Sequence, residues 1–403
     1  MKVLIFSSEF PPFQGGIGTY AHEMATAAAD LGLDVTVVAP DYGRAPDIRA
    51  VDGEPEEPRP YRLIRFEGGQ HAGRDLVAKI RLVRRIASEV SAPTIVHAAD
   101  WPFFIPLALS PFRGRSRCLV TVHGTEVRFM QHPKRAIPLR LLRFWNGWAE
   151  YVANSEYTAD ALRQAFSPPP DKVHPIGLGV GDAWLAHPVD RPAARRRHHV
   201  AADRFVIVTL GRLVPRKGHL VLAEALGRLP AASARAIVWR IVGPPIDRAY
   251  VDELQRRVAG LEADVRILGP LPRPDVMDLV AAADLFCLPA YRSADGAVEG
   301  FGLAFLEAAA LGVPALATTS GGIPDAVVSG VTGLLVPPED PAALAEALQR
   351  LQADPALRHA LGKNAREHAA SRSWRSVAAL TYLPGSDVEA GHDLAREPAE
   401  THS

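Results

Sequence analysis

The chain has 403 residues, of which 48% are hydrophobic and 22% charged, values that exclude wholesale disorder. Its length suits two α/β domains better than one ordinary core. Lys and Arg total 45, as do Asp and Glu, so the formal net charge of +0 excludes an overall field that would attract nucleic acid.

The cysteines and the N-terminus bear on the compartment. Cys118 and Cys287 each lie in an apolar run, and no group of Cys and His has the spacing of a zinc site. The apolar segment Val3–Phe6 is too short for a signal peptide, and no run of about 18 apolar residues occurs. We therefore expect a cytoplasmic protein with reduced cysteines.

In the first half, short apolar runs alternate with amphipathic helical stretches, which is typical of a parallel sheet covered by helices. The predicted strands are Val3–Phe6, Val35–Ala39, Tyr61–Phe66, Thr94–His97 and Leu119–His123. The predicted helices are Thr19–Leu31 and Asp75–Val90, and residues 43–60, rich in Pro and charge, are expected to form a loop.

The same alternation restarts in the second half. The predicted strands are Phe205–Leu210, Ile237–Val242, Val265–Leu268, Leu285–Leu288, Ala315–Thr318 and Gly333–Val336. The predicted helices are His219–Leu229, Gly302–Leu311 and Ala342–Ala353. The glycine-rich stretch Ile176–Gly181 is predicted to form a hinge between the halves.

Ligands of doubly wound sheets bind beyond the carboxyl ends of the strands, so the loops that follow strands carry the candidate sites. Gly15–Thr19 follows the first strand, and its glycines would let backbone N–H groups approach a phosphate, although a plain capped turn looks alike. Gly211–Gly218 also follows a strand and contains Arg212 and Lys217. These two cations would neutralise a diphosphate, while a solvated basic loop is the alternative.

Carboxylates and a histidine follow further strands. Glu299 and Glu307 frame a glycine-containing helix start. Carboxylates accept hydrogen bonds from sugar hydroxyls, but the helix dipole also favours an acid at a helix start, so both explanations stay open. Gly124 beside His123 leaves room for a ligand, which favours His123 over His97 as a site residue, although a lone histidine at a strand end is more often a packed or surface residue.

Taken together, these residues resemble the retaining glycosyltransferases of family 4, which adopt the GT-B fold. The resemblance is carried by Phe10-Pro11-Pro12 with Gly15-Gly16, Gly211–Gly218, Glu299–Glu307, Gly321–Asp325 and Ser373-Trp374. It implies an α/β protein with two Rossmann-like doubly wound domains that face a central cleft. The implied parts are residues 1–182 on the acceptor side, 183–370 on the donor side, a helix at 371–384 that crosses back, and a disordered tail at 385–403.

The resemblance also implies a role for each matching residue. Arg212 and Lys217 would bind the donor diphosphate, and Glu299 would hold the hydroxyls of the transferred sugar. Glu307 would bind the ribose, and His123 would lie near the reacting sugar. The remaining implied donor-binding residues are Gly16 and, through their backbone N–H groups, Phe301, Gly302 and Leu303.

The implied activity is metal-independent transfer of a hexose from a nucleotide-sugar, with retention by front-face attack; the nucleotide-sugar is a substrate, and no cofactor is expected. The stretch Pro289–Glu299 looks like that of mannosyltransferases, which favours GDP-mannose, with UDP-glucose or UDP-GlcNAc as the alternative. The acceptor would be a hydroxyl of a lipid, a polysaccharide or a small molecule. A sugar-nucleotide-binding protein with a degenerate site is the alternative from another class.

Two basic stretches remain. Residues 132–148 combine cations with Trp145 and Trp148, which fits peripheral contact with the inner membrane face. An ordinary helix with its cations outward and its tryptophans in the core is the favoured alternative. Arg195–His199 is expected to form a solvated loop.

Overall fold

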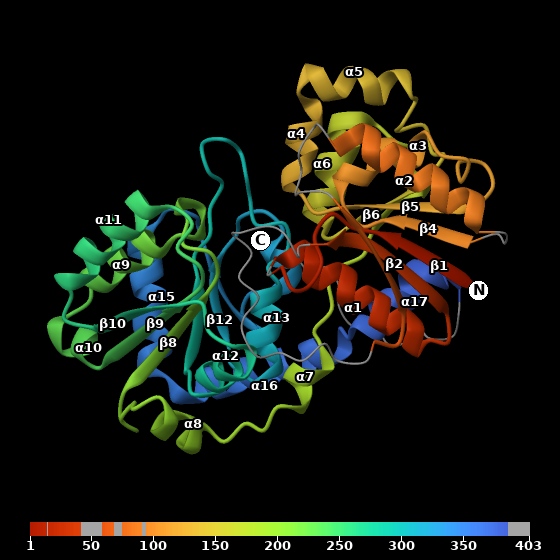
Figure 1. The fold of residues 1–403 in the computed structure, drawn as a ribbon. Coiled ribbons are helices and arrows are strands. Elements are labelled where there is room, and N and C mark those ends of the chain that lie inside the picture. Colours follow the sequence, from red (N-terminus) through yellow and green to blue (C-terminus); the bar gives the residue numbers. More distant parts are fainter. Residues whose placement is uncertain (14, 42–58, 68–74, 91–93, 386–403) are drawn as a thin grey trace, which may run out of the picture. The chain divides into compact units, whose positions relative to one another are not determined.

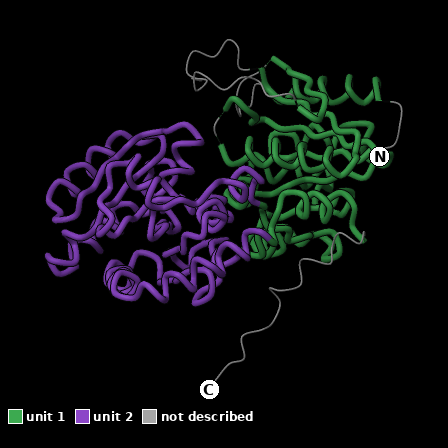
Figure 2. The backbone as a smooth tube through the Cα atoms, turned by 90° about the horizontal axis from the view of Figure 1, so that it is seen from below, with its two compact units in different colours: residues 1–179, 371–403 green, residues 180–370 purple. Residues whose placement is uncertain are grey.

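The computed structural model describes residues 1–13, 15–41, 59–67, 75–90 and 94–385. The chain forms two compact units: unit 1 contains residues 1–179 together with the chain from residue 371 onward, and unit 2 contains residues 180–370 (Figure 2). Nearly all of the predicted loop at 43–60 and of the predicted tail at 385–403 lies outside the described residues.

Unit 1 is built on a seven-stranded parallel sheet with strand order β3-β2-β1-β4-β5-β6-β7 (Figure 1). Its strands are short runs of β-branched and other apolar residues, which suit a sheet buried on both faces. They are β1 (Lys2–Phe6), β2 (Asp34–Asp41), β3 (Arg62–Glu67), β4 (Thr94–Ala98), β5 (Arg117–Val122), β6 (Glu150–Ala153) and β7 (Val173–Pro175).

Helices cover both faces of this sheet, with α1 and α17 on one face and α2, α3 and α6 on the other (Figure 1). The α6 helix begins where Ser155 accepts a hydrogen bond from the N–H of Thr158, an N-cap that satisfies one free donor of the first turn. The helices are α1 (Gly16–Asp30), α2 (Leu76–Glu89), α3 (Phe104–Ala108), α4 (Thr125–Gln131), α5 (Pro133–Leu141), α6 (Glu156–Phe166) and α17 (Trp374–Tyr382); the 3-10 turns are η2 (Trp101–Phe103) and η3 (Pro170–Lys172).

Unit 2 repeats the plan with a six-stranded parallel sheet of order β10-β9-β8-β11-β12-β13. The strands are β8 (Phe205–Leu210), β9 (Ile237–Val242), β10 (Asp264–Gly269), β11 (Leu285–Leu288), β12 (Ala315–Thr318) and β13 (Gly333–Val336). The helices are α7 (Asp182–Ala186), α8 (Arg191–Arg197), α9 (His219–Gly227), α10 (Ala231–Arg235), α11 (Arg248–Ala259), α12 (Arg273–Ala281), α13 (Leu303–Ala310), α14 (Ile323–Ala326), α15 (Pro341–Ala353) and α16 (Pro355–Ser371), with the 3-10 turn η4 (Pro215–Lys217).

The α17 helix, the last one in the described part of the chain, packs against α1 within unit 1. Arg375 donates to the carbonyl of Asp30 at the end of α1, over 2.8 Å. A Cβ on Gly179 would lie 2.7 Å from the backbone nitrogen of Trp374, so only glycine permits this close approach. Gly179 belongs to the stretch that is predicted to form a hinge. The structure shows that a glycine is required at this position because the backbone of α17 packs directly against it.

Several element boundaries differ from the predictions. β5 ends at Val122, so His123 belongs to the following loop and not to the strand. β6 and β7, of four and three residues, have no counterpart among the predicted strands. No described helix is long and apolar enough to cross a membrane.

Candidate active site

In unit 2, the basic loop after β8 is pressed against the segment that follows β11. Gly218 has a φ of +75°, and a Cβ there would lie 2.0 Å from the carbonyl oxygen of Pro289. The N–H of Tyr291 donates to the carbonyl of Arg216 over 2.9 Å. The two loops are therefore held together by their backbones, which fixes the position of Lys217 in η4.

The loop brings two cations to one carboxylate oxygen. Lys217 Nζ lies 2.5 Å and Arg216 Nη1 lies 3.1 Å from Oε2 of Glu299. Lys217 is only 9% exposed. The backbone of Glu299 is fixed as well, because its carbonyl accepts the N–H of Gly322 over 2.9 Å. A Cβ on Gly321, whose φ is +60°, would lie 2.3 Å from that carbonyl oxygen.

These contacts shift the acidity of both partners. Burial raises the pKa of the Glu299 carboxyl, but the adjacent Lys217 and Arg216 lower it by more, so the net shift is downward and the carboxylate stays ionised. Burial lowers the pKa of the Lys217 ammonium, and Glu299 opposes that change. The group is therefore an ion cluster of two cations around one anion, with a surplus of positive charge.

Arg212 adds to this surplus from the loop just after β8. Its side chain is exposed and has no hydrogen bond or ion pair with any described residue. Its charge nevertheless acts on Lys217, contributing to the lowered pKa of the ammonium. An exposed guanidinium beside a buried ammonium forms a site with affinity for phosphate oxygens.

The other predicted donor-binding residues of unit 2 lie at the start of α13. Gly302 has a φ of +94° and is the residue before the helix, where a Cβ would lie 2.5 Å from the Phe305 ring. The side chain of Phe301 is buried, and Leu303 is the first helical residue. Glu307 is half-buried, one turn after Leu303 on the same helix.

In unit 1, His123 lies in the loop after β5 with its ring fixed by a hydrogen bond. Its Nε2 is 2.8 Å from the carbonyl oxygen of Ala99, and because a carbonyl only accepts, Nε2 carries the proton. Its backbone N–H donates to Glu126, and the ring of Tyr20 meets its edge with 5.0 Å between centroids. This arrangement leaves Nδ1 without a hydrogen-bond partner in the described part of the chain, so it is able to accept a hydrogen bond.

Gly16 is the first residue of α1, and a Cβ on it would meet nothing within 4 Å. The first turn of α1 has no side-chain cap and no acidic residue. Its first N–H groups are therefore available to an anion. The preceding loop is tied to β4 by Asp100, a fully buried carboxylate that accepts the N–H and the hydroxyl of Ser8.

The structure brings Lys217 and Glu299 into direct contact and puts the charge of Arg212 beside them. Arg216 also lies at this site but was not predicted from the sequence, although it belongs to the basic loop Gly211–Gly218. Asp100 was also missed, because nothing in its spacing shows that it reaches Ser8. The fully buried His97 lies in β4, away from any open surface.

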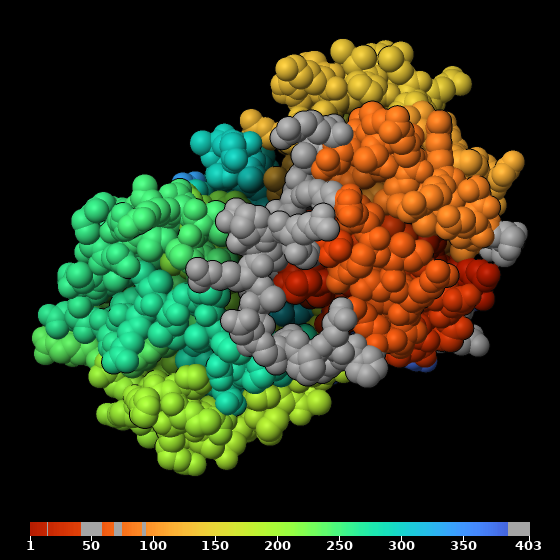
Figure 3. All heavy atoms as spheres, in the orientation of Figure 1, coloured from red at the N-terminus to blue at the C-terminus, as the bar shows by residue number. Residues whose placement is uncertain are grey.

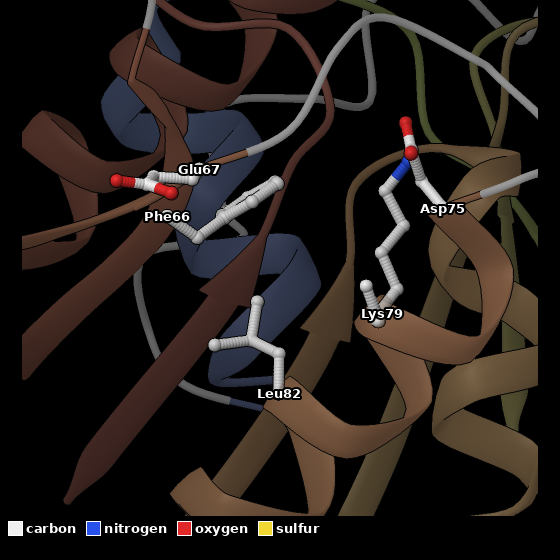
Figure 4. Close-up of a pocket in the computed structure, with 6 residues that line it drawn as sticks. Phe66, Glu67, Asp75, Lys79 and Leu82 are labelled. Carbon is white, nitrogen blue, oxygen red and sulfur yellow. The ribbon is translucent and has the colours of Figure 1, made fainter.

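A separate small pocket in unit 1 is lined by Phe66, Glu67, Asp75, Ala78, Lys79 and Leu82. Figure 4 shows Lys79 extended with its ammonium towards Asp75. Burial lowers the pKa of this ammonium, and Asp100 and Asp75 oppose the change. The described residues contain no group of three or more His, Cys, Asp or Glu arranged to hold a metal ion.

Comparisons with known proteins cover both units. Residues 14–184 match the model described as Glycosyltransferase Family 4, and residues 190–368 match Glycosyl transferases group 1. The GDP-mannose-dependent monoacylated alpha-(1-6)-phosphatidylinositol monomannoside mannosyltransferase of Corynebacterium glutamicum is 31% identical over 93% of this chain and 94% of that protein. The GDP-mannose-dependent alpha-(1-6)-phosphatidylinositol monomannoside mannosyltransferase of Mycolicibacterium smegmatis has the same identity and coverage.

Among solved structures, Anabaena HepE in complex with UDP and glucose has a TM-score of 0.73 at 22% identity, covering 94% of this chain and 98% of that one. This likeness confirms the predicted GT-B fold with its two parallel-sheet α/β domains. The family matches and the relatives confirm the predicted family and enzyme class. The chain belongs to the family 4 glycosyltransferases, and it is an enzyme that transfers a glycosyl group.

Proposed function

We propose that this enzyme transfers a mannosyl group from GDP-mannose to a hydroxyl of a lipid-linked acceptor, with retention and without a bound metal ion. The observation that carries the proposal is the contact of Lys217 with Glu299, beside the exposed Arg212. Two relatives that align over nearly the whole chain are named as GDP-mannose-dependent and as acting on a phosphatidylinositol monomannoside. Their names support the choice of donor and the class of acceptor.

In this proposal, unit 2 binds the donor. Arg212 and Lys217 stabilise the diphosphate as the sugar–phosphate bond breaks and negative charge grows on the leaving oxygen, which is why no metal is required. Oε1 of Glu299 has no hydrogen-bond partner among the described residues and would accept hydrogen bonds from hydroxyls of the sugar. N–H groups at the start of α13 and the carboxylate of Glu307 would bind the rest of the donor.

Unit 1 would bind the acceptor, with His123 and the start of α1 facing it. The acceptor hydroxyl attacks from the side of the leaving group, and the leaving phosphate oxygen takes its proton. No protein nucleophile is required in this route, and the new bond keeps the anomeric configuration of the donor. The bond between the sugar and the diphosphate breaks, the bond between the sugar and the acceptor oxygen forms, and the proton of the acceptor hydroxyl passes to the diphosphate.

We further propose that the enzyme works in the cytoplasm at an anionic membrane surface, where a lipid-linked acceptor is found. Between Glu126 and Glu150 the chain has five Lys or Arg and no acid. The α5 helix within this stretch also exposes Ile137 (59%) and Leu141 (79%). It lies on the outside of unit 1, in yellow in Figure 3. Cations beside exposed apolar side chains suit the surface of an anionic bilayer.

The test of the donor is binding of GDP, UDP and ADP to the purified protein, followed as the thermal midpoint with EDTA present. A ligand that binds only the folded state raises the midpoint. We expect GDP alone to raise it, and transfer from GDP-mannose to a phosphatidylinositol mannoside to continue in EDTA. An α-linked product by NMR would agree with retention. A shift with UDP alone, or turnover that stops in EDTA, would contradict the donor or the metal-free route.

A further inference from the structure

Arg216 lies at the candidate site but has no part in the proposed chemistry so far. Its guanidinium Nη1 is 3.1 Å from Oε2 of Glu299 and 3.4 Å from the carbonyl oxygen of Val298. Lys217 Nζ approaches the same carboxylate oxygen at 2.5 Å. One oxygen of Glu299 therefore has two cationic partners at once, which is more than a single carboxylate requires.

The surroundings make an unpaired charge costly at this place. The side chains of Arg216, Lys217 and Glu299 are 16%, 11% and 14% exposed. An ionised carboxylate so far from water is strongly destabilised when its only cation is removed. Lys217 is therefore able to leave Glu299 for a phosphate oxygen only if another cation stays behind.

Arg216 meets that requirement because its backbone is fixed independently of Lys217. Its carbonyl accepts the N–H of Tyr291, and the η4 turn is closed against Pro289 by Gly218. The guanidinium reaches Glu299 from this fixed point and is also held by the Val298 carbonyl. A guanidinium keeps its charge at any physiological pH, whereas an ammonium is the more mobile donor.

We propose that Arg216 is a positioning residue for donor binding: it keeps the Glu299 carboxylate paired and in place while Lys217 turns from Glu299 to the donor diphosphate. The inference rests on the proposed function, since it takes the anion to be a nucleoside diphosphate. Arg216 itself does not contact the donor in this scheme. Arg216 lowers the free energy needed to separate the Lys217 ammonium from the Glu299 carboxylate.

The test compares binding of a nucleoside diphosphate to four variants of the full-length protein by calorimetry. In Arg216→Gln, Lys217 remains tied to Glu299, so we expect GDP to bind at least about tenfold more weakly, as when a buried charge would be left unpaired. In Arg216→Gln/Glu299→Gln there is no carboxylate that would remain unpaired when Lys217 binds the diphosphate, so the affinity for GDP should return to within about threefold of wild type. Arg216→Lys should bind GDP nearly as wild type does.

The matched control is Arg235→Gln, an exposed arginine of α10 that pairs with Glu262. It should leave GDP affinity unchanged. A purely structural role of Arg216 predicts that the double variant binds as weakly as Arg216→Gln, or more weakly, and that result would overturn the proposal. So would wild-type affinity in Arg216→Gln.

The same experiment separates this inference from the proposed donor. If wild-type protein binds UDP and not GDP, the donor is wrong, and the order of the four variants measured with UDP still decides the role of Arg216, because the diphosphate is shared. If the wild type binds no nucleoside diphosphate at all, both the proposed function and the role of Arg216 are overturned. Thermal midpoints of all variants show whether each one is folded.

Discussion

The Nδ1 atom of His97 lies 2.8 Å from the hydroxyl oxygen of Tyr382, and this contact joins the middle of the unit 1 sheet to α17. On its other side, Nε2 of His97 is 2.6 Å from Oγ1 of Thr121, which in turn is 2.9 Å from the hydroxyl of Tyr20. Burial lowers the pKa of His97 to about 3, so its ring is neutral in the folded protein. This buried chain of polar groups ties α1 and α17 to the sheet.

The neutral state of His97 predicts a loss of stability in acid. Unfolded histidine takes up a proton near pH 6.5, but folded His97 does so only near pH 3, so between these values the unfolded state binds more protons. His97 alone should therefore lower the free energy of unfolding by about 1.4 kcal/mol for each pH unit between 6.5 and 3. His219 of unit 2, whose pKa burial also lowers to about 3, should act alike.

Urea unfolding at pH 7.5, 6.5, 5.5 and 5.0 measures this dependence. Replacement of His97 by Asn should remove its share of the slope, whereas replacement of the exposed His132 should leave the slope unchanged. Equal stability of the wild type at pH 6.5 and 5.0 would show that the buried histidines are not neutral in the folded protein.

Loss of the Tyr382 hydroxyl isolates the contact with α17. Tyr382→Phe leaves the ring in place and removes the partner of His97 Nδ1, so we expect unfolding to become easier by about 1–3 kcal/mol. Differential scanning calorimetry gives the change in midpoint. Tyr291→Phe is the control, because the Tyr291 hydroxyl makes no hydrogen bond to any described residue, and it should shift the midpoint little. Equal effects of the two substitutions would contradict the importance of the His97 contact.

Two glycines with nearly the same φ separate backbone strain from steric exclusion. Gly218 and Gly330 have φ values of +75° and +77°. A Cβ on Gly218 would lie 2.0 Å from the carbonyl oxygen of Pro289, whereas one on Gly330 would meet nothing within 4 Å. Gly330→Ala should therefore cost only the left-handed strain, about 1–2 kcal/mol.

Gly218→Ala should cost several kcal/mol more, or disrupt the fold of unit 2, because backbone must move away from backbone. It should also displace Lys217 next to it and weaken nucleotide binding. Chemical unfolding of the two variants side by side gives the difference. Equal destabilisation by both would mean that the loop after β8 is not pressed against Pro289.

The positions of the site loops could be predicted because they follow strands. Eleven predicted strands overlap strands of the structure, from Val3–Phe6 in β1 to Gly333–Val336 in β13. Short apolar runs bounded by polar loops identify such strands, and parallel sheets bind ligands at their carboxyl ends. Arg212, Lys217 and Glu299 could be selected on this ground together with the resemblance to the family.

What could not be predicted are contacts between side chains far apart in the sequence. The prediction of a solvated loop for Arg195–His199 is wrong. Arg195 lies in α8, is buried, and its Nη2 is 2.5 Å from Oδ2 of Asp284, which is 89 residues further along the chain. The role of Arg216 was missed for the same reason, since only the fold shows that it shares an oxygen of Glu299 with Lys217.

The tryptophans of the basic stretch show a related limit. Trp145 is buried and Trp148 is partly buried, and both lie in the core after the end of α5. The expectation that tryptophans pack inward is confirmed. The apolar side chains that α5 exposes are the aliphatic Ile137 and Leu141, whose exposure depends on how α5 packs and not on their residue type.

Removal of the ammonium at the site tests the proposed chemistry. Lys217→Ala leaves Glu299 paired with Arg216, so the protein should fold, but the diphosphate loses a cation as its charge develops. Turnover should fall by a factor of about 100 or more. Lys363→Ala, an exposed lysine of α16, is the control and should retain full activity. A near-wild-type rate for Lys217→Ala would exclude this residue from the chemistry.

The exposed face of α5 predicts that the enzyme binds to anionic membranes. We expect the wild type to sediment with vesicles that contain anionic lipid and not with vesicles of neutral lipid alone, since the five cations of residues 127–149 supply attraction of about 1 kcal/mol each near the surface. Replacement of both Ile137 and Leu141 by Ser removes apolar surface that would be buried among the lipids. Because burial of each such side chain is worth about 1.5–3 kcal/mol, binding to anionic vesicles should fall by about tenfold or more.

The matched control replaces Val328 and Val331, two exposed apolar residues of unit 2, by Ser. This control variant should bind vesicles as the wild type does, because Val328 and Val331 do not belong to the surface around α5 that is proposed to bind the membrane. If the α5 variant and the control lose binding equally, the apolar contribution is not specific to α5. If the wild type binds neutral and anionic vesicles alike, the cations around α5 contribute nothing to binding, and the surface proposed for the membrane is the wrong one.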